Sequence, residues 1–301
     1  MSESTHIEID QIMLPPARIR RLRGLLEATV DRIGPLVDLH RPYVDGLENL
    51  PADGRFLLVG NHTQSGPETY LIPYVVRRAI GTLVRPLADR RIAQMGGPAG
   101  DVLAACGAVV GAPETARELM THNQTILVFP GGGPEIAKFK GEEYKLRWQE
   151  RDGFARLSVE NSYPIVPAAL VGGDDVYRSL NSRDGAWGRI SQAVGEKMSG
   201  RSDMAMPLMR GIGPTLIPRP QRMYLRFAAP IDTVKPARVA EDRWVATVRQ
   251  RTKDSLEQAL AGLLEVRADD PYRELNPLAW RDATQPPVPP HRGDLLRGCW
   301  A

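Results

Sequence analysis

The sequence predicts an α/β fold in which a mixed, mostly parallel central sheet is covered by helices on both faces and is preceded by an N-terminal amphipathic helix. Three short apolar runs, at residues 56–59, 126–129 and 165–171, are typical of strands buried on both faces of a parallel sheet. Segments with helical periodicity alternate with these runs, as they do in βαβ units. The chain has 301 residues, which is enough to bury one large core.

The first predicted helix spans residues 15–33 and begins at two prolines, which are favoured at a helix start. Its arginines lie opposite an apolar face. Such a helix can lie in a membrane interface, with its guanidinium groups near lipid phosphates, or it can pack on the main domain. The apolar residues are Ile19, Leu22, Leu25, Leu26, Val30 and Ile33, and the arginines are Arg18, Arg20, Arg21 and Arg23.

The remaining elements follow in order along the chain. Strands are predicted at residues 56–59, 82–84, 108–110, 126–129, 165–171 and 223–227, and helices at 65–78, 98–105, 113–121, 153–161 and 237–264. The Met-rich segment 204–218 predicts either the wall of an apolar groove or a loop packed over the core. We therefore expect a helical segment at residues 1–43, a main domain at 44–266 and an extended, Pro-rich tail at 267–301.

Composition excludes several classes of protein. With 42% hydrophobic and 25% charged residues and only two cysteines, the chain is neither disordered nor a disulfide scaffold, and a reducing, cytoplasmic location is expected. The net charge of +3 does not indicate a nucleic-acid partner. No apolar run approaches the roughly 18 residues of a membrane-spanning helix. Local clusters of arginines nevertheless suit an anionic membrane surface or phosphate-bearing substrates.

The strand at residues 56–59 ends in a turn that carries His62. Catalysis in open α/β sheets concentrates at the carboxyl ends of strands, and an imidazole can accept a proton near neutral pH, so His62 is a candidate general base. A histidine satisfied in the core is the alternative. Glu68 is spaced so that its carboxylate could accept the other imidazole N–H and fix the tautomer. The alternative for Glu68 is a capping box with Ser65 at the start of the following helix.

A glycine-rich turn follows the strand that ends at Phe129. The backbone N–H groups of Gly131, Gly132 and Gly133 are candidates for binding a phosphate or stabilising an oxyanion, and Glu135 adds a carboxylate to the turn. The spacing is neither that of a Walker A loop nor that of a dinucleotide site. Three basic residues are candidates for holding phosphates, with solvated surface charge as the alternative: Lys138, Lys140 and Arg85.

Taken in order, these segments resemble the glycerolipid acyltransferase superfamily, related to bacterial 1-acylglycerol-3-phosphate acyltransferases, over residues 44–232. Gly-Leu-Glu-Asn-Leu-Pro at 46–51 resembles the family's lead-in, and His62 with Glu68 resembles its His/Asp block. Phe-Pro-Gly-Gly at 129–132 resembles the Phe-Pro-Glu-Gly block, and Ile-Val-Pro at 165–167 resembles the block that closes the site.

Three departures from the family pattern indicate a particular branch. Glu68 stands one residue later than the usual Asp, and Gly131 replaces the usual Glu. The run at residues 129–135 is more similar to diacylglycerol and monoacylglycerol acyltransferase-like proteins. The Arg-bearing block that grips glycerol phosphate is missing around residues 107–112, so the resemblance implies a neutral acceptor.

The resemblance implies an O-acyltransferase that moves a fatty acyl group from acyl-CoA to the hydroxyl of a glycerolipid or lysophospholipid. His62 would be the base, Glu68 its support and the glycine turn the oxyanion site. No metal or other cofactor is expected, and the protein would be peripheral on the inner face of the membrane. The alternatives are an ester or thioester hydrolase on the same fold and a lipid-binding scaffold without turnover. A serine hydrolase is disfavoured because no G-x-S-x-G motif is present.

Overall fold

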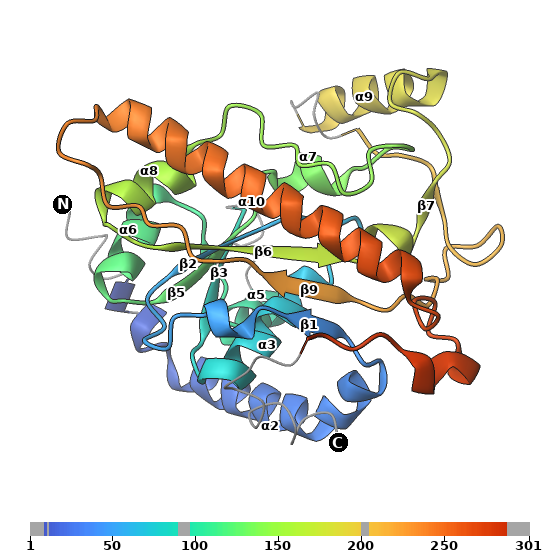
Figure 1. Ribbon diagram of the computed structural model, residues 1–301, viewed down its shortest axis with the longest axis horizontal. Helices are drawn as coiled ribbons and strands as arrows, with labels where there is room; N and C mark the ends of the chain where they lie inside the picture. Colours follow the sequence, from blue (N-terminus) through green and yellow to red (C-terminus); the bar gives the residue numbers. More distant parts are fainter. Residues whose placement is uncertain (1–8, 11, 90–96, 200–204, 288–301) are drawn as a thin grey trace.

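A computed structural model describes residues 9–10, 12–89, 97–199 and 205–287 of the chain (Figure 1). Within these residues, seven strands form one sheet in the order β1–β9–β6–β2–β5–β3–β4, and β7 and β8 form a second, two-stranded sheet. The large sheet contains β1 (Tyr43–Asp45), β2 (Leu57–Gly60), β3 (Val84–Ala88), β4 (Val109–Val110), β5 (Thr125–Val128), β6 (Ile165–Val171) and β9 (Tyr224–Phe227). The small sheet contains β7 (Arg178–Ser179) and β8 (Met209–Arg210).

All neighbouring strands of the large sheet are parallel except β6 and β9, which run antiparallel. The predicted mixed, mostly parallel sheet is therefore confirmed. The central trio β6, β2 and β5 is parallel, so the carboxyl ends of these three strands meet at one edge of the sheet.

Helices cover both faces of this sheet, as predicted (Figure 1). In the view of Figure 1, α10 and α8 lie above the sheet and α3 and α2 lie below it. The described helices are α2 (Ala17–Leu39), α3 (Glu68–Ile80), α5 (Gly97–Ala105), α6 (Pro113–Thr121), α7 (Gly132–Ile136), α8 (Gly153–Glu160), α9 (Ala186–Ser199) and α10 (Glu241–Asp269). Short 3-10 helices occur at η1 (Leu47–Asn49), η2 (Gly173–Asp175) and η3 (Pro277–Asp282). No helix of the described ranges is long and apolar enough to cross a bilayer.

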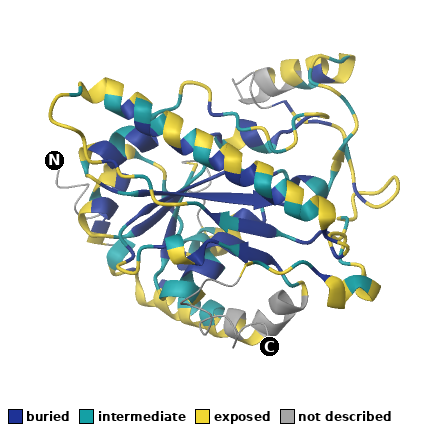
Figure 2. Ribbon diagram, viewed as in Figure 1, coloured by how far each residue is buried: buried dark blue, intermediate teal, exposed yellow. Residues whose placement is uncertain are grey.

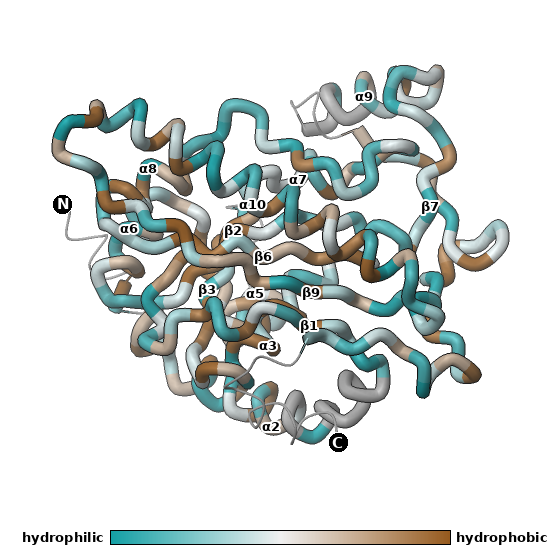
Figure 3. Tube along the Cα trace, viewed as in Figure 1, coloured by the Kyte–Doolittle hydropathy of each residue, from teal (hydrophilic) through white to brown (hydrophobic). Residues whose placement is uncertain are grey.

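The apolar runs of the sequence form a two-sided core because successive side chains of a strand point to opposite faces. Leu57 and Val59 pack in the cluster that contains residues of α8 and α10, whereas Phe56 and Leu58 pack in the cluster that contains residues of α3. The strands are buried and carry many of the most hydrophobic residues (Figures 2 and 3). This double burial explains why the strands read as continuous apolar runs.

The N-terminal helix packs on the main domain, which was one of its two predicted placements. Ile19 of α2 is buried, and α2 contacts α5. The Arg23 guanidinium donates to the backbone carbonyls of Ala105 and Ala104, at 3.0 and 3.1 Å. Leu25 remains 63% exposed, so the contact with the domain uses only part of the apolar face.

Differences from the predicted elements concentrate beyond β6. The helix α9 (Ala186–Ser199) and the strands β7 and β8 were not predicted, and the closing helix begins and ends a few residues later than expected. The predicted tail begins inside α10 and includes η3, while its last part, residues 288–301, lies outside the described residues.

Candidate functional site

Three neighbouring strands deliver the segments of the candidate site. The segment with His62 follows β2, the glycine-rich turn follows β5, and η2 (Gly173–Asp175) follows β6. Because β6, β2 and β5 are adjacent and parallel, these three segments meet at the carboxyl edge of the sheet, where open α/β folds place their ligands.

Glu68 contacts the imidazole of His62. Glu68 Oε1 lies 2.5 Å from His62 Nδ1, and the Glu68 side chain is completely buried. The same carboxylate accepts the Thr63 backbone N–H at 3.0 Å and the Thr63 hydroxyl at 2.5 Å. These contacts fix the carboxylate and leave Nε2 as the imidazole atom that can exchange a proton with a ligand.

The capping box predicted as the alternative for Glu68 is not formed. Helix α3 begins at Glu68, and Pro67 precedes it without a side-chain capping bond. The Ser65 hydroxyl donates instead to the Gly173 carbonyl at 2.7 Å, which ties the loop after β2 to the segment after β6.

The imidazole of His62 lies against Phe129 and lines a cavity. The two rings stack with centroids 4.6 Å apart and planes 18° apart, and the His62 side chain is 14% exposed. The ring is therefore not sealed in the core, which was the alternative to a functional histidine.

The cavity has a volume of about 1250 Å³ and is lined mainly by apolar side chains. From His62 it extends between α3, β3 and α5 and reaches α2. Its size and lining suit a fatty acyl chain better than a small polar substrate. Representative lining residues are Tyr70, Pro73, Leu87, Leu103, Ile136 and Met206.

The glycine-rich turn borders the same cavity, but its three amides are not equivalent. Gly132 and Gly133 line the cavity with His62. The Gly132 N–H, however, donates to the Phe129 carbonyl at 3.0 Å, so the turn itself uses this predicted oxyanion donor. The Gly131 carbonyl accepts from the Arg151 guanidinium at 2.7 Å, which holds the turn in place.

Glu135 does not line the cavity, contrary to its predicted place among the substrate-binding residues. Its carboxylate is completely buried and accepts the His62 backbone N–H at 2.8 Å and the Arg147 N–H at 3.3 Å. Burial raises the pKa of this carboxyl, while Lys138 and the two N–H donors act in the opposite direction. A Cβ atom on Gly131 would lie 1.7 Å from Glu135 Oε2, so the Glu135 carboxylate fills the space that a side chain at position 131 would need.

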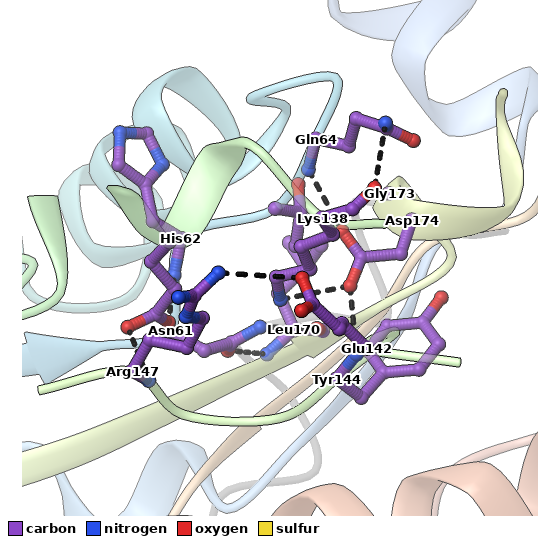
Figure 4. A network of polar contacts seen from close by, with 12 residues as sticks. Asn61, His62, Gln64, Lys138, Glu142, Tyr144, Arg147, Leu170, Gly173 and Asp174 are labelled. Atoms are coloured by element: carbon purple, nitrogen blue, oxygen red, sulfur yellow. Dashed lines mark hydrogen bonds and ion pairs between the residues drawn. The ribbon is translucent and has the colours of Figure 1, made fainter. Parts of the chain in front are cut away.

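Lys138 is also buried, so the prediction that it holds a phosphate is wrong. Its Nζ atom lies 2.8 Å from Asp174 Oδ2, and both side chains are 1% exposed. Asp174 also accepts the backbone N–H groups of Gln64 at 2.7 Å and Tyr144 at 2.8 Å (Figure 4). The ammonium group therefore neutralises a carboxylate that joins the segments after β2 and β6 and leaves nothing to bind an anion.

The other two predicted phosphate ligands do not line the cavity either. Arg85 on β3 is buried, and its guanidinium lies 3.4 Å from the Gln124 side-chain oxygen. Burial and the neighbouring Arg23 lower the pKa of Arg85 to about 10. Lys140 is exposed, and its backbone N–H donates to the Asn181 carbonyl at 3.1 Å.

Asp174 is the site residue that the sequence interpretation missed. It follows the buried strand β6, a direct neighbour of β2, just as His62 follows β2. A polar residue directly after a second strand of the predicted parallel sheet was the signal that could have placed it at the same edge.

Comparison with known proteins connects this geometry to a family. The acyltransferase family model matches residues 41–171. Phytyl ester synthase 1 of Arabidopsis thaliana is 29% identical over 249 residues, which are 77% of this chain and 35% of that protein. The chain thus spans about a third of the length of this relative. The human "DGAT1/2-independent enzyme synthesizing storage lipids" is 27% identical over 141 residues, which are 47% of this chain and 43% of that protein.

A solved structure also aligns with most of this chain. The crystal structure of the 1-acyl-sn-glycerophosphate (LPA) acyltransferase PlsC from Thermotoga maritima aligns with 85% of this chain and 88% of its own. The alignment has a TM-score of 0.44 and a sequence identity of 17%.

Proposed function

We propose that this chain is a member of the glycerolipid acyltransferase superfamily and that it transfers a fatty acyl group from a thioester, acyl-CoA, to the hydroxyl group of a lipid. The observation that carries the proposal is the pairing of His62 with the buried Glu68 on the wall of a large apolar cavity. The cavity supplies room for an acyl chain, and the pair supplies a base.

The reaction begins when His62 Nε2 takes the proton of the lipid hydroxyl while its oxygen attacks the thioester carbonyl carbon. Glu68 holds the Nδ1 proton, keeps the ring in the productive tautomer and stabilises the imidazolium. The tetrahedral intermediate then collapses: the C–O bond stays, the C–S bond breaks, and the proton passes from Nε2 to the departing thiolate. No covalent enzyme intermediate is needed.

The oxyanion of this intermediate forms beside the glycine-rich turn. Gly133 lines the cavity with His62, and its amide is our candidate donor; the Gly132 amide is used by the turn. A single backbone donor of this kind is worth about 3 to 4 kcal/mol of transition-state stabilisation.

A neutral lipid alcohol is the acceptor that we propose. The cavity that His62 lines has mainly apolar walls, which include Tyr70 and Pro73, and the basic residues predicted to hold phosphates, Lys138 and Arg85, are buried and do not line it. The names of the relatives, a phytyl ester synthase and an enzyme of storage-lipid synthesis, support the same choice.

The test is acyl transfer by the purified protein from labelled acyl-CoA to a panel of acceptors: long-chain alcohol, monoacylglycerol, diacylglycerol and lysophosphatidic acid. We expect an acylated alcohol or glyceride. His62→Ala should lower the rate by about 10²- to 10⁴-fold, because general-base catalysis contributes that much. His122→Ala is the matched control, since this histidine is exposed at the end of α6.

Three outcomes would contradict the proposal. Release of free fatty acid without an acylated product would assign the site to a hydrolase. Tight lipid binding without turnover would assign it to a scaffold. Equal rates for the wild type and a folded His62→Ala variant, judged by circular dichroism, would remove the imidazole from the reaction.

A further inference from the structure

The small sheet presents a mixed basic and apolar face to solvent. In the antiparallel register of β7 and β8, Arg178 pairs with Arg210 and Ser179 pairs with Met209. Leu180 continues the register, because its N–H donates to the Leu208 carbonyl at 2.8 Å. Alternate residues of a strand share a face, so Arg178 and Leu180 lie beside Leu208 and Arg210, and all four are exposed.

The opposite face of this hairpin is tied to the candidate active site. The Ser179 hydroxyl donates to the Lys138 carbonyl at 2.5 Å and accepts from the Gln64 side-chain amide at 3.1 Å. Gln64 is two residues from His62. The hairpin is therefore anchored with one face inward and its arginines outward.

The two paired arginines border a pocket of about 350 Å³ that also contains Arg219, residues 211–213 and Glu274. Within the described residues, Arg178 and Arg210 have no carboxylate partner, whereas Arg219 lies 3.8 Å from Glu274. The lining of the pocket thus includes three arginines and a single glutamate, whose side chain is 60% exposed. Guanidinium groups match the geometry of phosphate oxygens, so an oxygen-rich anion such as a phosphate is the ligand that this pocket suits.

Placing like charges directly opposite each other in a hairpin is unfavourable for folding. The Arg178–Arg210 pair has no role in packing, since both side chains are exposed. An anion bound between the two guanidinium groups would offset their repulsion and so account for the pair.

An apolar loop adjoins the pocket. The loop after β8 projects from the edge of the molecule, and hydrophobic residues lie along it (Figures 1 and 3). Internal bonds hold its shape, because the N–H groups of Gly211 and Ile212 donate to the carbonyls of Thr215 and Ile217, at 2.6 and 2.8 Å. Ile212, Leu216 and Ile217 are nevertheless 50%, 68% and 58% exposed. Apolar side chains held outward mark a binding surface.

We propose that this region docks on an anionic phospholipid surface. The hairpin surface consists of Arg178, Leu180, Leu208, Arg210, Ile212, Leu216 and Ile217. Its apolar side chains enter the membrane interface, and the arginine pocket binds a lipid phosphate. A lipid surface is favoured over a soluble anion because the apolar and cationic groups lie side by side.

Met206, in the same segment, lines the cavity with His62, so docking would place the cavity beside the bilayer that holds the lipid acceptor. Only this last step rests on the proposed function.

The experiment is vesicle sedimentation of the full chain without any turnover. Vesicles of phosphatidylcholine containing phosphatidylglycerol should bind the protein, and binding should fall as salt is raised. Arg178→Gln with Arg210→Gln should weaken binding about tenfold or more. Ile212→Ser with Leu216→Ser should weaken it as well. Because relief of the paired charges favours folding, the melting temperature of the arginine variant should be unchanged or higher.

The matched control is Arg238→Gln with Arg243→Gln, which removes the same charge near the N-terminal end of α10, on the opposite side of the molecule from β7 in Figure 1. This variant should bind like the wild type. If both arginine variants weakened vesicle binding equally, the effect would depend on net charge alone, and the proposal would be overturned. Binding of inorganic phosphate or CoA without binding of vesicles would overturn it too, by assigning the pocket to a soluble anion. Failure of acyl transfer with intact vesicle binding would contradict only the proposed function.

Discussion

Two buried ion pairs, each between a basic side chain and an aspartate, lie in different parts of this molecule. Lys138–Asp174 lies at the carboxyl edge of the sheet, with 2.8 Å between its charged groups and 1% exposure of each side chain. Arg222–Asp270 lies where β9 meets the end of α10, with 2.6 Å between the groups and similar burial. Burial and length do not distinguish the two pairs.

The partners of the two carboxylates do distinguish them. Asp174 accepts the N–H of Gln64, in the loop that carries His62. Asp270 accepts the Tyr224 hydroxyl and the N–H groups of Tyr272 and Thr284, none of which lies near the cavity. The first pair positions a candidate catalytic loop, whereas the second fastens the end of the last long helix. A buried ion pair therefore indicates a functional site only when its carboxylate also accepts hydrogen bonds from residues of that site.

The largest expected effect comes from Lys138→Met. It leaves the Asp174 carboxylate buried without its cation, which should lower the free energy of unfolding by about 3–5 kcal/mol. The loop after β2 should shift as well, and a displacement of about 1 Å at a catalytic group can cost about 10²-fold in kcat. Denaturant unfolding and acyl transfer per folded molecule measure the two losses.

The double variant Lys138→Met with Asp174→Asn separates these effects. Removing both charges should restore much of the stability, because no unpaired ion remains. The rate should stay low if the pair positions the His62 loop. Full recovery of the rate would show that Lys138–Asp174 is a purely structural pair, as we infer for Arg222–Asp270.

Asp270→Asn should cost about as much stability, about 3–5 kcal/mol, since it leaves Arg222 buried without a carboxylate. The kcat of the folded fraction should nevertheless remain within about twofold of the wild type, because Asp270 lies away from the cavity. A loss of kcat comparable to that of Lys138→Met would show that the two regions are coupled.

The stability cost of Asp270→Asn should depend on pH. Burial acts to raise the pKa of Asp270, but hydrogen bonds from Tyr224, Arg222 and backbone N–H groups outweigh it and leave the pKa below its usual value. The stabilisation is thus present above the unfolded-state pKa of about 3.9 and is lost as pH falls through the folded-state pKa. The difference in unfolding free energy between wild type and variant should shrink below about pH 4. A constant difference would contradict this ionisation.

A smaller effect is expected for Glu135→Gln. The carboxylate accepts two backbone N–H groups, and the NH₂ of a glutamine would face one of them, so we expect a loss of kcat of about tenfold through the shifted His62 backbone. Burial raises the pKa of Glu135, so wild-type stability falls as pH rises through that pKa. As pH rises, the unfolding free energy of the wild type should therefore fall relative to that of the variant. The opposite trend would contradict the raised pKa.

The smallest effect is expected for Arg117→Ala. Arg117 lies 2.9 Å from Glu160, but their side chains are 45% and 31% exposed. Exposed pairs contribute about 0–1 kcal/mol and are screened by salt. Acyl transfer should not change. This variant sets the baseline against which the two buried pairs are judged in denaturant unfolding.

Much of the fold could be predicted because its signals are local. The run Ile165–Val171 became β6 with the predicted bounds, and the helix Pro113–Thr121 likewise agreed with its prediction. Strands of two or three residues, such as β1 and β8, carry too few residues for a periodic pattern, and pairing with distant partners creates them.

The candidate site was predictable in part. His62 with Glu68 was recognisable because strand end, loop and helix start are contiguous in the sequence. Lys138 was predicted to hold a phosphate, with solvated surface charge as the alternative, because its partner Asp174 lies 36 residues away along the chain. A lysine next to a glycine-rich turn predicts a phosphate site or a solvated surface charge, and only the folded chain brings the distant carboxylate to it.

The sequence by itself determined the strands buried on both faces, their alternation with helices, and the placement of an imidazole and a carboxylate at one strand end. Only the tertiary structure decided which distant groups meet: the buried Glu135 at the His62 backbone, the buried Lys138 against Asp174, and two exposed arginines opposite each other on a hairpin. The physical reason is range. Hydrophobic periodicity acts over one element, whereas the pairing of charges and N–H groups depends on how distant segments pack.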